Sequence, residues 1–198
     1  MKTMHPSPTL PVPAARTRPL TWAAILYPVV WIVGLAIRAP SVGNDRSQQE
    51  TWDAIHGSAS TGWQVLLIHG IAGILLMLIA ALVFGRRQGE RVGDTRWILA
   101  TGVVAGAISL IQWAIETSIV FGILGSSATN AHDRWQLVAI IDGAKMLVLA
   151  GFVLALAFAG SRPGRWERNV SIAAAIALVA SGIGYLFLLA PLMLAAAL

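Results

Sequence analysis

The chain has 198 residues, of which 57% are hydrophobic and only 12% are charged, and its mean hydropathy is +0.72. Soluble domains carry about twice that share of charged residues, so the composition excludes a water-soluble enzyme and a disordered protein. The chain has no cysteine, which excludes a disulfide scaffold, thiol catalysis and thiolate-bound metals.

The first segment, residues 1–19, contains five prolines, which oppose a regular helix, and we expect a disordered cytoplasmic tail there. Five apolar stretches follow, each close to the ~20 residues that a helix needs to cross a hydrocarbon layer. We expect membrane helices at about residues 20–37, 64–84, 97–124, 135–159 and 170–198, joined by polar, glycine-rich loops. The sequence therefore predicts an all-α fold, with one membrane domain of five helices over residues 20–198.

The basic residues predict how this domain is oriented. Ten lysines and arginines lie in the tail and in the loops after the second and fourth apolar stretches, whereas the opposite side carries three. The positive-inside rule then places the N-terminus in the cytoplasm and the C-terminus outside, as in a multi-pass protein of the plasma membrane. Lipid headgroups account for these arginines, so we expect lipids as partners and no nucleic acid.

Polar side chains inside the apolar stretches are the candidate site, because a charge in a membrane helix costs about 2.5–3.5 kcal/mol. At 1.5 Å per residue, His69, Glu116, Asp142 and Lys145 lie about 8, 13, 10 and 15 Å below the expected outer ends of their helices. Asp142 and Lys145 share one helix face, and Gln112 and Glu116 share another. We expect these five side chains to form a pocket in the outer half of the bilayer.

Three functions fit this pocket. The first is binding or transport of a small ligand or a proton. If the protein conducts such a species across the membrane, we expect it to form a homo-oligomer or to belong to a larger membrane complex. The second is an intramembrane enzyme for a lipid or isoprenoid-like substrate, with Glu116 or Asp142 as the acid and His69 as the base. The third is an accessory or structural subunit, whose charges only fix helix packing. We expect no cofactor, and no metal, because Lys145 would repel a cation.

Other helix residues indicate packing. Gly102 and Gly106 form a G-x-x-x-G spacing that lets helices approach closely. Tyr27 and Tyr185 are within the first and fifth stretches; aromatic packing is the expected role, and reaching the pocket is the alternative.

The loop between the first two stretches, residues 39–63, carries several acidic residues. We expect residues 47–56 of this loop to be solvated and irregular, and the alternative is a short interfacial helix that covers the pocket as a lid. Before the fourth stretch, His132 and Asp133 either extend the site or cap the helix, and we expect Asn130 or Asp133 to be the cap.

Overall fold

The computed structural model describes residues 18–40, 45–87, 92–158, 164–187 and 189, and these residues form an all-helical fold without strands. The elements are α1 (Arg18–Ala36), α2 (Gln48–Ile55), α3 (Ala59–Val65), a π-helical segment (Leu66–Ile71), α4 (Ala72–Arg86), α5 (Val92–Val120), α6 (Ala128–Phe158) and α7 (Arg165–Leu186). The α3, π-helical and α4 segments are continuous. Five helices in the described residues are therefore long and apolar enough to cross a membrane.

The ends of these helices differ from the predicted ones. Arg18 and Pro19, which we expected in the tail, belong to α1, because the first turn of a helix tolerates proline. The second long helix begins at residue 59 rather than 64, and α6 begins at residue 128 rather than 135. α5 ends at Val120 rather than at residue 124, since Gly122 and Leu124 have positive φ values of 62° and 54°. Residues 1–17, 159, 188 and 190–198 of the expected segments lie outside the described residues.

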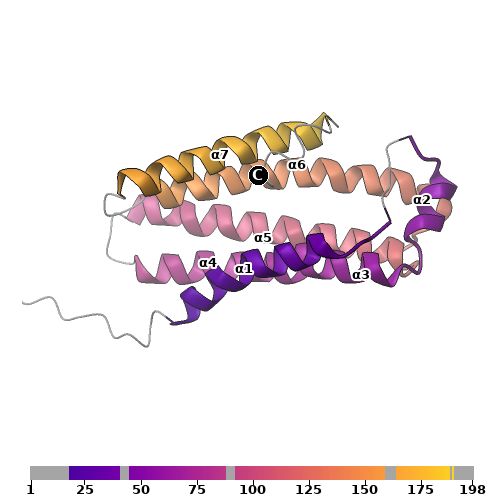
Figure 1. Ribbon diagram of the computed structural model, residues 1–198, viewed down its shortest axis with the longest axis horizontal. Helices are drawn as coiled ribbons and strands as arrows, with labels where there is room; N and C mark the ends of the chain where they lie inside the picture. The colour runs from indigo at the N-terminus through magenta and orange to yellow at the C-terminus, as the bar shows by residue number, and fades with distance from the viewer. Residues whose placement is uncertain (1–17, 41–44, 88–91, 159–163, 188, 190–198) are drawn as a thin grey trace, which may run out of the picture.

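The long helices pack in the order α1, α4, α5, α6, α7, so that each contacts the next one in this row. Figure 1 shows them running side by side, with α2 lying across one end of the bundle. A core of buried apolar side chains from α4, α5 and α6 includes Leu76, Ile98 and Phe152. Residues of α1 and α7, such as Tyr27 and Leu178, pack against this same core.

Glycines make the closest helix crossings. A Cβ atom on Gly73 of α4 would lie 2.9 Å from the Ser109 Cβ and 3.1 Å from the Gly106 carbonyl oxygen of α5. A Cβ atom on Gly143 of α6 would likewise lie 2.9 Å from the Gly182 carbonyl oxygen of α7. A side chain at either position would push the backbones apart. Gly106, singled out by its spacing, thus lies at a close contact.

The segment after α1 forms the short helix α2, so the solvated-loop interpretation is wrong for residues 48–55. Ser47 caps this helix, and the Glu50 side chain accepts a hydrogen bond from the Ser47 backbone N–H at 2.8 Å. These hydrogen bonds, from the backbone first and the Ser47 hydroxyl second, lower the pKa of Glu50. The buried face of α2 presents Thr51 and Ile55 to the ends of α5 and α6.

The end of α2 is joined to the end of α5. The Gly57 backbone N–H donates to the Val120 carbonyl oxygen at 2.7 Å, and His56 Nδ1 lies 3.2 Å from the Ile119 carbonyl oxygen. The His56 ring stacks on Trp52 with its centroid 4.0 Å away. α2 therefore packs on the bundle as a fixed cap, whereas its action as a lid stays a prediction.

Candidate functional site

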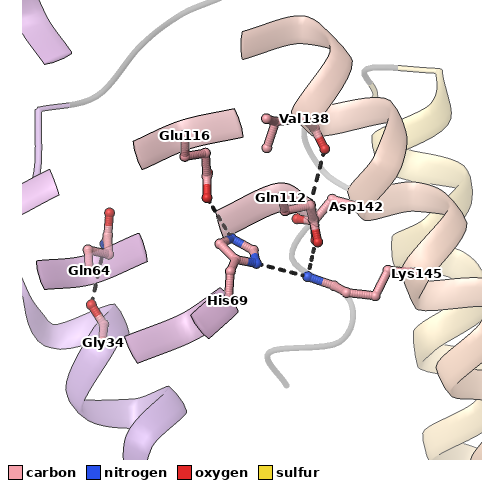
Figure 2. A network of polar contacts seen from close by, with 8 residues as sticks. All are labelled: Gly34, Gln64, His69, Gln112, Glu116, Val138, Asp142 and Lys145. Atoms are coloured by element: carbon pink, nitrogen blue, oxygen red, sulfur yellow. Dashed lines mark hydrogen bonds and ion pairs between the residues drawn. The ribbon is translucent and has the colours of Figure 1, made fainter. Parts of the chain in front are cut away.

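The five polar residues singled out in the sequence come together as one buried network, shown in Figure 2. The π-helical segment supplies His69, α5 supplies Gln112 and Glu116, and α6 supplies Asp142 and Lys145. We call this set of five residues the buried network. Its members are far apart in the chain, so only the packing of three helices brings them into contact.

The contacts form a chain across the bundle. Lys145 forms an ion pair with Asp142, and its Nζ lies 3.2 Å from His69 Nδ1. The other ring nitrogen of the histidine, Nε2, lies 3.5 Å from the Oε2 atom of Glu116. Gln112 Nε2 donates to Asp142 Oδ1 at 3.1 Å, and it lies 3.3 Å from the Val138 carbonyl oxygen. His69 is therefore the link between the ion pair and the second carboxyl group.

The five residues of the network differ in how much of each is exposed. Gln112, Lys145, Glu116 and His69 are 0%, 2%, 4% and 8% exposed, whereas the Asp142 side chain is 14% exposed. Two buried acceptors, Gln112 Oε1 and Glu116 Oε2, have no hydrogen-bond partner among the described residues, and the His69 contact with Glu116 Oε2 is an ion-pair distance of 3.5 Å. Buried polar atoms are usually paired, so these two are the places where the network can accept another hydrogen.

The π-helical segment Leu66–Ile71 determines where the His69 side chain points. A π-helical turn inserts extra backbone into a helix, and such turns occur frequently at functional sites. Gly70 faces α5, since a Cβ atom there would lie in ordinary contact with the Trp113 side chain at 3.4 Å. Hydropathy and spacing did not predict this turn, because the segment is apolar like the helices on either side of it.

The observed helix ends change the expected depths of these residues. His69 lies ten residues after the start of α3, and Asp142 lies fourteen residues after the start of α6. At 1.5 Å per residue these separations are about 15 Å and 21 Å, rather than the expected 8 Å and 10 Å. Glu116, by contrast, lies four residues before the end of α5, about 6 Å rather than the expected 13 Å. Relative to the helix ends, His69 and Asp142 are therefore deeper than predicted and Glu116 is shallower.

The two tyrosines of the apolar helices pack against the apolar core. Tyr27 of α1 and Tyr185 of α7 both lie beside the buried cluster that includes Met146 and Leu149. This contact agrees with the expected aromatic packing.

The other polar candidates, His132 and Asp133, lie outside the buried network, at the end of the bundle where α2 packs. His132 Nδ1 lies 3.4 Å from the Thr51 hydroxyl, and Asp133 accepts from Gln48 at 3.5 Å. These residues hold α2 against α6 and do not extend the buried network. The expectation that Asn130 or Asp133 caps α6 is wrong, because α6 begins at Ala128 and both residues lie inside it. Asn130, in the first turn, accepts a hydrogen bond from the N–H of Ser127, the residue before the helix, at 3.0 Å.

In the described part of the chain, no three histidine or acidic side chains come together in a way that could hold a metal ion. The Lys145 amine stands between His69 and Asp142, in the place that a cation shared by these two residues would need. The network can instead hold and pass protons, because each of its contacts joins a titratable group or an amide to another.

Two clefts open on the described surface. One, of about 320 Å³, lies between α3 and α5 and includes Trp63 and Trp113 in its wall. The other, of about 270 Å³, has walls from α1, α4, α6 and α7. We call the second one the α1–α7 cleft. None of the five network residues lines either cleft.

No protein-family model matches the chain, and no curated protein or solved structure shows significant similarity to it.

Proposed function

We propose that the chain is a multi-pass protein of the plasma membrane whose buried network binds and relays a proton in the outer half of the bilayer. Five helices long and apolar enough to span a membrane support the first part of this proposal. The distribution of arginines supports an N-terminus in the cytoplasm and a C-terminus outside. Polar residues at this depth in a membrane are costly, which favours a functional role for them.

The observation that carries the proposal is the position of the His69 ring between two partners. Its Nδ1 atom lies 3.2 Å from Lys145 Nζ, and its Nε2 atom lies 3.5 Å from Glu116 Oε2. A neutral imidazole accepts a proton at one nitrogen while it releases the proton on the other. Glu116, whose Oε2 has no hydrogen-bond partner, is the proposed site where the relayed proton is held.

The charges around this relay favour proton binding coupled to ligand binding over conduction through a pore. Asp142 neutralises Lys145, so that a proton arriving at Glu116 does not meet an unbalanced cation. The close glycine contact between α4 and α5 lies on the side of His69 that faces the interior of the cell in the proposed orientation. We therefore propose that the proton reaches the buried network from the outer side. Binding of this proton drives or accompanies the binding of a small ligand.

Infrared difference spectroscopy of the reconstituted protein during a pH titration tests this proposal. We expect a carbonyl-stretch band from a protonated carboxyl group that appears as the pH falls, and that Glu116→Gln removes. The matched control is Glu167→Gln, which changes an exposed carboxylate on α7 and should leave the band in place. A band that persists in Glu116→Gln contradicts the proposal.

A structural role is the second candidate, because the network residues line neither of the two clefts. Because glutamine keeps the volume of Glu116 and can still lie beside His69, a proton-binding role predicts that Glu116→Gln changes the free energy of unfolding by no more than about 1 kcal/mol. A purely structural network predicts the opposite pattern, in which the wild type shows no titrating band and the variant is clearly destabilised.

A further inference from the structure

Gln112 presents a buried oxygen whose orientation is fixed by the other half of the amide group. Its Nε2 atom lies 3.1 Å from Asp142 Oδ1 and 3.3 Å from the Val138 carbonyl oxygen, which are both acceptors. A flipped amide would place an oxygen against these two oxygens, so the partners determine which way the amide points. Gln112 Oε1 is therefore an acceptor that lies away from α6 and has no partner among the described residues.

Glu116 presents a second such oxygen on the same face of α5. It follows Gln112 by four residues, and side chains with this spacing have Cβ atoms about 5–6 Å apart. Its Oε2 atom is buried and, within the described part of the chain, has no hydrogen-bond partner. An ionised Glu116 cannot pair with Gln112 Oε1, because both atoms are acceptors. One molecule with two donors can satisfy both of them.

A donor faces Glu116 from the π-helical segment. The Lys145 ammonium group can only donate, so His69 Nδ1, which lies 3.2 Å from Nζ, is the acceptor in that contact. The neutral histidine ring therefore carries its hydrogen on Nε2. Nε2 lies 3.5 Å from Glu116 Oε2 (Figure 2), whereas a usual N–H···O hydrogen bond measures about 2.7–3.2 Å. A long polar contact of this kind is typical of two groups that share a water.

The surroundings restrict what can bind among these three side chains. Gln112 and Glu116 are almost completely buried, and neither the α1–α7 cleft nor the cleft between α3 and α5 includes them. The Lys145 amine beside His69 disfavours a cation. A small, neutral molecule with two donors and one acceptor fits these conditions.

We propose that one buried water molecule binds between Gln112, Glu116 and His69. It donates one hydrogen to Gln112 Oε1 and the other to Glu116 Oε2, and its oxygen accepts the Nε2–H of His69. Buried waters typically make about three hydrogen bonds to polar groups that lack other partners, which is the number available here. Water binding follows from this pairing alone and does not rest on the proposed movement of a proton.

Nuclear magnetic resonance of the protein in detergent micelles, with ¹⁵N-labelled histidine and glutamine, tests the water site. We expect the nitrogen shifts of His69 to show hydrogen on Nε2 alone. We expect this proton and the side-chain amide protons of Gln112 to show cross-relaxation with water, of opposite sign in the laboratory and rotating frames, as for a bound water. Hydrogen on Nδ1, or the absence of cross-relaxation at His69 or at Gln112, overturns the proposal.

The variant Gln112→Met locates the water. It keeps most of the side-chain volume and removes the oxygen that the water would bind, so we expect the cross-relaxation at His69 to be lost. A signal relayed through the exchanging Lys145 amine would persist in this variant and contradict the proposal. Gln136→Met removes another glutamine amide of α6, which contacts His132 outside the buried network. It is the matched control and should leave the His69 signal unchanged.

The wild-type measurements stand without any substitution, so the proposal is tested even if Gln112→Met does not fold. The infrared band of Glu116 is a separate signal. A bound water without a titrating band contradicts the proposed relay alone, and a titrating band without a bound water contradicts the water site alone.

Discussion

Replacing Lys145 by methionine is the most informative perturbation of the buried network. The lysine is 2% exposed, and its amine contacts Asp142 and His69. Methionine keeps most of the volume and removes the charge, which leaves the Asp142 carboxylate with Gln112 as its remaining hydrogen-bond donor. Removing one partner of a buried ion pair costs about 3–5 kcal/mol. We therefore expect Lys145→Met to destabilise the protein by that amount.

Thermal unfolding in detergent, followed by tryptophan fluorescence, measures this effect. For a chain of this length, 1 kcal/mol corresponds to a change in Tm of about 2–4 °C, so we expect Tm to fall by roughly 6–20 °C. The double variant Asp142→Asn/Lys145→Met removes both charges and should recover most of the loss, as a coupling in a double-mutant cycle. Arg165→Met, which removes an exposed charge at the start of α7, is the control and should change stability by less than about 0.5 kcal/mol.

Two outcomes would refute this reasoning. The first is a free energy of unfolding for Lys145→Met within about 1 kcal/mol of the wild-type value. In that case Asp142 is not left as an unpaired buried charge when the lysine is removed. If the double variant is no more stable than the single one, the loss comes from packing around Lys145 and not from the unpaired Asp142.

The remaining predictions concern packing and the cap helix. Gly73→Val should destabilise the bundle by about 1–3 kcal/mol in the same assay, because its Cβ would meet the Ser109 Cβ at 2.9 Å, whereas Gly85→Ala, with nothing within 4 Å, should not. The lowered pKa of Glu50 means that its contribution to α2 is complete above the pKa of the unfolded chain and is lost as the pH falls through the lower, folded value. Amide hydrogen exchange in α2 should therefore accelerate at acidic pH in the wild type, after correction for intrinsic exchange rates, and Glu50→Gln should remove this dependence.

Local sequence patterns predicted the number and approximate positions of the long helices. The length and hydropathy of each apolar stretch predicted five spanning helices, because crossing a hydrocarbon layer sets a minimum length that the sequence meets. The ends were less predictable. α6 begins seven residues early, where Asn130 in its first turn accepts a hydrogen bond from the Ser127 N–H. α5 ends early, before Gly122 and Leu124, whose backbones have positive φ values. Such ends depend on single hydrogen bonds and turns, which hydropathy does not register.

The candidate site, like the helices, was predicted only in part from the sequence. Charge in an apolar stretch singled out His69, Glu116, Asp142 and Lys145, and helical spacing paired Asp142 with Lys145. Tertiary packing alone decided that His69 bridges the lysine and Glu116, because a contact between helices depends on their rotation and crossing. The π-helical segment sets that rotation for His69, and its apolar sequence gives no sign of it.

The sequence by itself determined which residues are costly to bury in a membrane, because that cost belongs to the side chain and to the length of the apolar segment around it. It also determined the charge asymmetry between the two sides of the domain. Only the tertiary structure decided that Gln112 of α5 contacts Asp142 of α6, and that residues of α1, α4, α6 and α7 line one cleft. These relations join residues from helices far apart in the chain, and packing between helices, unlike hydropathy, is not a local property.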